Sequence, residues 1–459
     1  MQWARRSYGG ADFKDARSTK RFVRMMARLA ARPAGRVSEV FTIPAERQGA
    51  YDFLEHRVTS CAVQDAIGDA CARDCKEHDC VLVVLDGTSL NFTDHAETKG
   101  FGRISAYWHK ARGLKLLNTL ALSTDGVPIG VPSQRYWIRD AEPKSKRIYR
   151  PAHARESVHW RNAVDEVSAR MARLAPATRL HFIADREADA SLFIADIIKR
   201  GHDVTVRAKG TRKVAAKGLR IPVRSKLNRQ KPVARMPLLI KARPGRRQRE
   251  VTLSVRMARL PLILRDRHAK KRRVHELTAV WAREEGRVPA GEERVEWLLY
   301  TTERVDTAAG ACAVVQRYSY RWRIEEMHRT MKSGVCRIED AQLRSVEAAT
   351  KWASMHSAIA ARVERLKQRS RLEPELPASE ELTETEIRAI VLLKRDEKKK
   401  TEVIPNGTPS LAQAVRWIAD LGGYVGNKSS GPPGTIVIKR GLERIRWAAK
   451  AIEALEKKR

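Results

Sequence analysis

The sequence predicts an α/β protein in which helical segments flank a central sheet. Two short apolar runs, residues 81–85 and 180–184, have the length and the β-branched content of buried strands. Residues 116–122 and 127–131 predict a meander between these two runs, and residues near 157–174 predict a helix. Strands therefore come first, followed by a helix and a further strand, an order that is typical of a mixed α/β sheet.

Each of the two apolar runs ends at an aspartate. Asp86 follows residues 81–85 and precedes residues 87–89, which we expect to form a turn. Asp185 follows the second run and opens a helical segment. Active sites of α/β sheets collect at strand ends, where a side chain is held rigidly and still faces solvent. Taken alone, each aspartate is better explained as a turn former or a helix cap, so a third carboxylate is needed to indicate a site.

Residues 318–332 predict one continuous helix with a polar face and an apolar back. At roughly 100° per residue, four polar side chains fall within about a 60° arc: Tyr318, Arg321, Glu325 and Lys332. A carboxylate can ligate a hard divalent cation, while arginine, lysine and tyrosine beside it can bind phosphate oxygens. The alternative is a solvated face that carries an Arg321–Glu325 ion pair. The opposite side carries three apolar side chains that can be buried: Ile324, Met327 and Met331.

The charge balance predicts a polyanionic partner. The 459 residues include 90 Lys and Arg against 54 Asp and Glu, a formal net charge of +36, and nucleic acid is the partner expected of so basic a chain. A basic stripe on a predicted helix of the first segment, Lys20, Arg24 and Arg28, is a candidate for phosphate contacts, with a solvated face as the alternative. Because no window approaches ~20 uninterrupted apolar residues and no secretion signal opens the chain, we expect a cytoplasmic protein without membrane contact.

The polar face of residues 318–332 carries the signature of a known family. Tyrosine, two residues, arginine, three residues, glutamate, six residues and lysine follow one another from Tyr318 to Lys332. On this motif the chain resembles the prokaryotic cut-and-paste DDE transposases of the insertion-sequence-four group, most closely its Tn5-like members. The two family aspartates match Asp86 and Asp185 in the right order, and the similarity extends over most of the chain.

The resemblance implies a fold and a domain organisation. It implies an RNase H-like catalytic core with a β-rich insertion, between a helical N-terminal DNA-binding domain and a helical C-terminal dimerisation domain. The domains expected are an end-binding domain over residues 1–70, a catalytic domain over 71–372 with the insertion at about 208–296, and a linker and dimerisation domain over 373–459. The charged part of this linker is expected around residues 398–407.

The resemblance also implies a chemistry and the residues that perform it. Asp86, Asp185 and Glu325 would hold two Mg²⁺ ions, with Mn²⁺ able to substitute, for nicking, hairpin formation, hairpin opening and strand transfer. Trp297 would stack on a flipped base, with a strand-core residue as the alternative. The residues expected to bind DNA are Tyr318, Arg321, Lys332, Arg207, Lys209, Trp297, Trp322, Lys20, Arg24 and Arg28.

The expected partners are double-stranded DNA, both as transposon ends and as target, and a second subunit that completes a synaptic homodimer at the bacterial nucleoid. Two alternatives remain open. An RNase H-like structure-specific nuclease would use the same acidic cluster, although the long insertion and the C-terminal segment speak against it. A catalytically silent or regulatory DNA-binding relative is opposed by the intact carboxylates of Asp86, Asp185 and Glu325.

Overall fold

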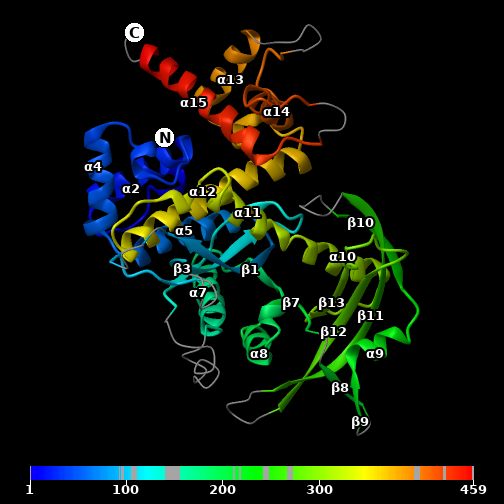
Figure 1. Ribbon diagram of the computed structural model, residues 1–459. Coiled ribbons are helices and arrows are strands. Elements are labelled where there is room, and N and C mark those ends of the chain that lie inside the picture. Colours follow the sequence, from blue (N-terminus) through cyan, green and yellow to red (C-terminus); the bar gives the residue numbers. More distant parts are fainter. Residues whose placement is uncertain are drawn as a thin grey trace.

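The structure is a computed structural model in which helices pack around one extended sheet (Figure 1). Residues 397–403, which include much of the charged linker expected around 398–407, lie outside the described residues. The described residues are 2–92, 94, 98–104, 111–139, 156–209, 212–216, 219–240, 248–265, 272–396, 404–426 and 431–456.

Four strands form the centre of the sheet. β1 (Cys80–Asn91) pairs antiparallel with β3 (Arg112–Leu122) and parallel with β6 (Arg179–Ala184), and β6 pairs in parallel with β7 (Asp203–Arg207). The helix α7 (Val158–Leu174) precedes β6 and packs its apolar side against this centre. The order is that of an RNase H-like core, so the predicted fold class is confirmed. The remaining elements here are β2 (Gly102–Arg103), β4 (Pro128–Gly130), β5 (Gln134–Trp137) and α8 (Ser191–Lys199).

β1 does not end at Asp86, because it stays paired with β3 as far as Asn91. The turn predicted at residues 87–89 is therefore wrong, and these residues continue the strand. Only the parallel pairing with β6 stops here, at the register Leu85↔Ala184. The side chain of Asp86, which follows Leu85, is thus held by the rigid strand β1 and lies just beyond the end of the neighbouring strand β6.

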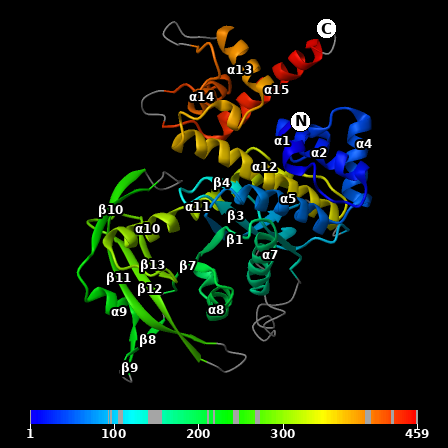
Figure 2. The ribbon, with the colours of Figure 1, turned by 180° about the vertical axis from the view of Figure 1, so that it is seen from behind.

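The β-rich insertion extends the same sheet rather than forming a separate one. β13 (Glu296–Thr301) pairs antiparallel with β7 and with β12 (Arg272–Glu284), and β12 pairs along its length with β11 (Arg249–Arg265). Figure 2 shows these strands as an arm on one side of the molecule. The other elements of this arm are β8 (Lys213–Ala216), β9 (Leu219–Pro222), α9 (Val223–Asn228) and β10 (Ala234–Ile240).

The long helix α12 (Val346–Leu372) is buried along most of its length and holds the first part of the chain against the body. Three of its polar side chains reach backbone carbonyl oxygens of residues near the N-terminus. These contacts join Lys351 Nζ to Leu54 O at 2.6 Å, Trp352 Nε1 to Gly35 O at 2.7 Å and His356 Nε2 to Ala34 O at 2.9 Å.

The first part of the chain is helical, as predicted. Its longest helices are α2 (Ala16–Ala31), which buries Phe22 and Met25, and α5 (Ser60–Cys75). Because α5 packs on α12 and α7, the domain boundary expected at residue 70 falls inside a helix that belongs to the packing of the body. The other helical elements are α1 (Gln2–Tyr8), α3 (Val37–Val40), α4 (Pro44–Asp52) and a π-helical turn at Phe53–Arg57.

The single helix predicted over residues 318–332 is wrong, because the structure forms two helices there. α10 (Ala308–Ser319) ends before Tyr320, and α11 (Trp322–Lys332) begins after Arg321. At the junction the N–H groups of Tyr320 and Arg321 donate to the carbonyls three residues earlier, and this tighter pattern interrupts the α-helix. The polar residues predicted to share one face are therefore divided between two helices.

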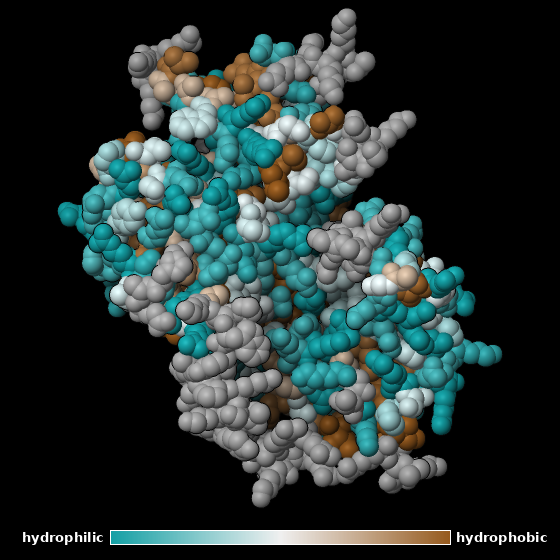
Figure 3. All heavy atoms as spheres, in the orientation of Figure 1, coloured by the Kyte–Doolittle hydropathy of each residue, from teal (hydrophilic) through white to brown (hydrophobic). Residues whose placement is uncertain are grey.

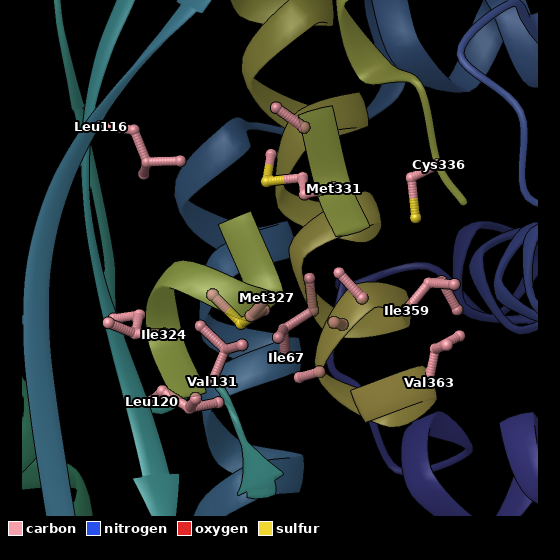
Figure 4. Close-up of a cluster of buried hydrophobic side chains, with 14 of the residues drawn as sticks. Ile67, Leu116, Leu120, Val131, Ile324, Met327, Met331, Cys336, Ile359 and Val363 are labelled. Atoms are coloured by element: carbon pink, nitrogen blue, oxygen red, sulfur yellow. The ribbon is translucent and has the colours of Figure 1, made fainter. Parts of the chain in front are cut away.

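The apolar back predicted for this region is confirmed. Ile324, Met327 and Met331 are completely buried. Figure 4 shows them between Leu116 and Leu120 of β3 on one side and the apolar side of α12 on the other. Because α11 is fixed by this packing, its polar residues are held in place over β1 and β3.

The C-terminal helices form a small bundle with its own core. α13 (Glu384–Asp396), α14 (Leu411–Leu421) and α15 (Thr435–Glu456) pack around Trp417, and Leu366 of α12 joins them. Figure 3 shows a mostly hydrophilic face on which apolar residues gather among these helices at the top. Within the described ranges, no helix has the length and apolar character needed to cross a membrane.

Candidate active site

The register between β1 and β6 places two aspartates side by side. The last parallel pair is Leu85↔Ala184, so Asp86 and Asp185 are the next residues on the two neighbouring strands. Asp185 accepts a hydrogen bond at 2.8 Å from the Glu187 N–H and caps the short 3₁₀ turn that follows. Asp185 is therefore a cap, as the simpler interpretation predicted, and it also lies beside Asp86.

Glu325 reaches the same place from α11. Nη2 of Arg321 donates to the Glu325 carboxylate, and Nη1 of the same guanidinium lies 3.8 Å from Oδ1 of Asp86. Arg321 is only 8% exposed. The Arg321–Glu325 ion pair that the sequence analysis gave as the alternative therefore exists, but it is buried rather than solvated. The Arg321 guanidinium also lies between Asp86 and Glu325 and bridges them.

The environment strongly perturbs Asp86. Burial raises the pKa of Asp86 to about 7, with Arg321 acting in the opposite direction and the charges of Asp185, Glu325 and Glu187 adding to the rise. A carboxyl group with this pKa is about half protonated at neutral pH. A divalent cation would favour its ionised form more strongly than one arginine does.

The donor set suits a hard divalent cation. Mg²⁺ prefers carboxylate oxygens and keeps several water ligands, and here the carboxylates come from two strands and a packed helix. As they stand, no three His, Cys, Asp or Glu side chains of the described residues are close enough together to hold a metal ion. Asp86, Asp185 and Glu325 would therefore share a cation only after their side chains move closer together than they stand here.

A tyrosine and two arginines gather next to these carboxylates. Burial raises the pKa of the Tyr318 hydroxyl, whereas the charges of Arg321 and Arg207 lower it. Arg207 is the last residue of β7, and its Nη2 donates to the Glu296 carbonyl at 3.0 Å. The structure thus brings together Tyr318, Arg321 and Arg207 although they lie on three different elements.

Lys332 and Lys209 lie further from the carboxylates. Nζ of Lys332 is 3.6 Å from the Glu339 carboxylate at the far end of α11. Lys209 is exposed beyond the end of β7, and its backbone N–H donates to Asp189 at 2.8 Å. Both lysines therefore make contacts with acidic residues other than Asp86, Asp185 and Glu325.

Trp297 is a core residue in this structure. Its ring is 4% exposed and packs edge to face on Tyr318 and Trp322, with centroid separations of 5.3 and 5.7 Å. The structure agrees with the strand-core alternative, and a base can stack on Trp297 only if these rings move. Trp322 is half-buried and is the more accessible aromatic side chain.

Replacing Trp297 with alanine should destabilise the protein more than Trp322→Ala does. Removing a buried tryptophan ring typically costs about 3–5 kcal/mol, whereas Trp322 is already partly solvated. Thermal unfolding of the two variants measures this difference. In DNA processing, a stacking role predicts that hairpin formation slows more than the first nick. Equal slowing of both steps in Trp297→Ala would leave it a core residue only.

The basic stripe lies on α2, away from the carboxylates. Lys20 and Arg24 are exposed. Arg28 is ion-paired at 2.7 Å with Glu46 of α4, and both residues line a recess against Lys450 of α15. Two of the three predicted cations are therefore open to solvent, whereas the third is engaged within the protein.

Two polar residues that the sequence analysis did not single out lie against Asp86. Asn118 is its direct cross-strand partner on β3, and His328 approaches from α11 with Nδ1 3.7 Å from Oδ2 of Asp86. Burial lowers the pKa of His328 to about 3, and nearby cations add to this effect. Each had a signal in the sequence, because Asn118 interrupts an apolar strand and His328 follows Glu325 by three residues on a helix.

The fold and the site together define the class of RNase H-like nucleases and transposases. Three family models match the chain. A transposase DNA-binding model matches residues 1–58, a transposase DDE domain model matches residues 142–362, and a transposase Tn5 dimerisation domain model matches residues 358–454. Together the three matches fit a DDE transposase of the insertion-sequence-four group with the domain set of the Tn5-like members.

The matched regions extend what the site alone shows. The first and last models support DNA binding and homodimer formation. The DDE domain implies dependence on a divalent metal ion, generally Mg²⁺. That match covers Asp185 and Glu325 but begins after Asp86, so the placement of Asp86 rests on its register with β6.

Proposed function

We propose that the protein is a cut-and-paste DNA transposase whose catalytic residues are Asp86, Asp185 and Glu325. The observation that carries this proposal is the register of β1 and β6, which sets the two aspartates side by side, with Glu325 joined to Asp86 through Arg321. The net charge of +36 and the DNA-binding match support a DNA substrate.

Two Mg²⁺ ions held by these carboxylates, or Mn²⁺ in their place, would activate water or a 3′-hydroxyl and stabilise the leaving oxygen of an in-line displacement. The protein's part is to keep the carboxylates rigid. Asp86 is held by the pairing of β1 with β3, and Glu325 is held by the buried apolar back of α11. Rigid placement of this kind keeps the donors near a productive geometry without reorganisation during the reaction.

The cations around the cluster are proposed to bind the DNA backbone beside the reacting phosphate. Arginine suits this task because its planar guanidinium can bind two phosphate oxygens at once. Arg321 would exchange its carboxylate partners for phosphate when DNA and metal bind, and Tyr318 would add a hydroxyl donor. The other residues proposed to contact DNA here are Arg207, Lys209 and Lys332, together with Trp322 and, once uncovered, Trp297.

One site would perform four steps in order. Each transposon end is nicked, the freed 3′-hydroxyl attacks the opposite strand to form a hairpin, water reopens the hairpin, and the same hydroxyl attacks target DNA. Each step is a displacement at phosphorus by an oxygen nucleophile, so no covalent protein–DNA bond is required. One set of carboxylates therefore suffices for the whole sequence.

The test is cleavage of a DNA fragment that carries the inverted repeats flanking the gene. With Mg²⁺, the full-length protein should release the fragment between the repeats with hairpin ends and then join it to a target plasmid. A structure-specific nuclease would instead cut branched DNA whatever its end sequence and would join nothing. A silent relative would shift the fragment on a gel without cutting it. Either of these two results would overturn the proposal.

Replacing Lys20 or Arg24 with alanine should weaken binding to transposon ends without affecting the folded core. Each cation that neutralises one phosphate contributes about 0.9 to the slope of log K against log salt, so each variant should lose about one unit of slope. Arg28→Ala should change the slope less, because this residue is already paired with Glu46. Fluorescence anisotropy at several salt concentrations measures the slopes, with the exposed Arg395→Ala of α13 as the charge control. If the slopes of log K against log salt are unchanged in the Lys20→Ala and Arg24→Ala variants, α2 is not part of the DNA interface.

The working assembly is proposed to be a homodimer that pairs two transposon ends at the bacterial nucleoid. The match to a dimerisation model supports the assignment of this task to the C-terminal helices. Ile436 and Trp447 of α15 are 58% and 59% exposed and lie about 20° apart around the helix. These two exposed apolar side chains, with Arg440 and Glu443 between them on the same side of α15, supply surface that a second subunit can bury.

A further inference from the structure

A chain of polar side chains runs from β3 through α11 to the Asp86 carboxylate. Nδ2 of Asn118 lies 3.2 Å from Nε2 of His328, and Nδ1 of His328 lies 3.7 Å from Oδ2 of Asp86. Asn118 and His328 are 0% and 6% exposed, so both act inside the protein. Asn118 and Asp86 are also direct partners in the β1–β3 ladder, which fixes their separation.

The two neighbours of the His328 ring select the same tautomer. An amide nitrogen only donates hydrogen bonds, so the Nε2 atom that faces Asn118 must be an unprotonated acceptor. A neutral imidazole then carries its proton on Nδ1, the atom that faces Asp86. Turning the Asn118 amide around would favour Nε2–H instead and would point the Nδ1 lone pair at Asp86, which is repulsive when Asp86 is ionised, the form that binds a metal ion. The Nδ1–H form therefore suits both contacts.

The Asp86 carboxylate lies between two groups of different kinds. Its Oδ1 faces Nη1 of Arg321 at 3.8 Å, and Glu325 lies on the other side of that guanidinium. Its Oδ2 faces His328 at 3.7 Å, which is longer than a hydrogen bond. If Arg321 exchanges the carboxylates for phosphate, as proposed above, Asp86 keeps His328 as a neighbour that can donate to it.

We propose that His328 is a positioning residue for Asp86, with Asn118 fixing the imidazole so that Nδ1–H holds Oδ2 while Oδ1 stays directed toward Glu325. A donor behind a metal-binding side chain fixes its orientation and is commonly important for metal affinity. His328 touches neither metal nor DNA in this scheme. This role of His328 rests on the proposed function, so the experiment has to distinguish a failure of the positioning role from a failure of the proposed metal site.

The matched pair of variants is His328→Asn and His328→Leu. The asparagine amide nitrogen takes the place of Nδ1 and keeps a donor toward Asp86, whereas leucine has a similar branched shape and no donor. Binding of Mn²⁺ to the DNA-free protein, measured by electron paramagnetic resonance of the unbound ion, reports on the carboxylates without any cleavage step. We expect His328→Leu to weaken Mn²⁺ binding about 10- to 100-fold and His328→Asn to stay within about threefold of the unmodified protein.

The reference variant is Asp86→Ala. If Asp86→Ala binds Mn²⁺ as tightly as the unmodified protein does, the proposed metal site itself fails. If Asp86→Ala loses Mn²⁺ binding while His328→Leu keeps it, the site stands and only the positioning role is overturned. Equal losses in His328→Leu and His328→Asn, together with lower unfolding temperatures, would also overturn it, because His328 would then act by packing.

A spectroscopic measurement on the unmodified protein does not depend on how the variants fold. In protein labelled with ¹⁵N-histidine, the imidazole signals of His328 can be assigned by their absence in His328→Asn. Their ¹⁵N chemical shifts at pH 8, where Asp86 is mostly ionised, and without metal, should be those of a neutral ring protonated at Nδ1. A ring protonated at Nε2 would overturn the proposal, whatever the Mn²⁺ affinities are.

Discussion

Alanine in place of Asp86, Asp185 or Glu325 should slow DNA cleavage by roughly 10³-fold or more, because several kcal/mol of transition-state stabilisation depend on the cations these carboxylates hold. Binding to transposon ends should be retained, since it is driven by the basic surface of a chain with a net charge of +36. Mg²⁺-dependent nicking of labelled end DNA measures the first effect and gel shift the second. Asp125→Ala removes an exposed carboxylate from the turn between β3 and β4 and should cleave normally.

The stability of a neutral Asp86 variant separates a catalytic role from a structural one. Because burial raises the pKa of Asp86 to about 7, the folded protein binds its proton more tightly than the unfolded chain and loses stability as the pH rises toward 7. Without metal at pH 8, Asp86→Asn should therefore unfold at the same or a higher temperature than the unmodified protein. If Asp86→Asn is inactive but stable, its defect lies in the chemistry and not in folding. If any of the three alanine variants nicks DNA normally, the residue replaced in that variant is not part of the site.

A chain that ends at Leu372 should bind a single transposon end but fail to pair ends or to cleave them. The deletion keeps α2 with its exposed Lys20 and Arg24 and removes α13, α14 and α15. If cleavage requires a dimer, a protein of this charge is prevented from cutting DNA at every nonspecific encounter. Gel shift should show the single-end complex and no paired-end complex. Efficient cleavage of a lone end by the truncated chain would contradict this account.

Point variants test the same dependence in the full-length protein. Trp447→Ser removes an exposed apolar ring from α15 and should weaken end pairing while single-end binding persists. Leu392→Ser changes a side chain of α13 that is 52% exposed and serves as the matched control. Similar losses of pairing in both variants would mean that general surface polarity, and not the Trp447 ring, explains the effect.

Mixed dimers show which subunit cuts which end. We expect the subunit that binds one end through its first domain to cut the other end. When a binding-competent Glu325→Ala subunit is paired with an unmodified one, the end bound by the Glu325→Ala subunit should be cut and the partner's end should stay intact. Cutting of only the end bound by the unmodified subunit would show that each subunit acts on its own end.

The elements that carry the candidate site could be predicted from the sequence where local pattern and packing agree. Apolar runs located the strands before Asp86 and Asp185, and the spacing of Ile324 and Met327 located the buried side of α11. These patterns work because burial of a whole strand or helix face dominates the local energy. The parallel pairing of β1 with β6 is a tertiary contact that these runs alone do not specify.

Other features depend on tertiary contacts that no local pattern contains. At Tyr320 a few backbone hydrogen bonds join residues three apart instead of four apart. The free-energy cost of this change is small, and the packing of α10 and α11 on different neighbours can offset it. The partnership of Asn118 with Asp86 depends on strand register, and the burial of Trp297 depends on the arrival of Tyr318 from another element. A helical wheel and a strand pattern therefore located the strands and the buried side of α11 but assigned some polar residues the wrong neighbours.

The contacts of α12 with the first helices imply a long delay during synthesis. The side chains that hold the carbonyls of Gly35 and Leu54 are 317 and 297 residues further along the chain. At a translation rate of about 5–20 residues per second, roughly 15–60 s pass before Trp352 exists to meet Gly35. During that time the N-terminal helices must remain folded, or remain chaperoned, without the helix that later covers them, so the ribosome-bound chain is most exposed to aggregation and proteolysis before α12 is complete.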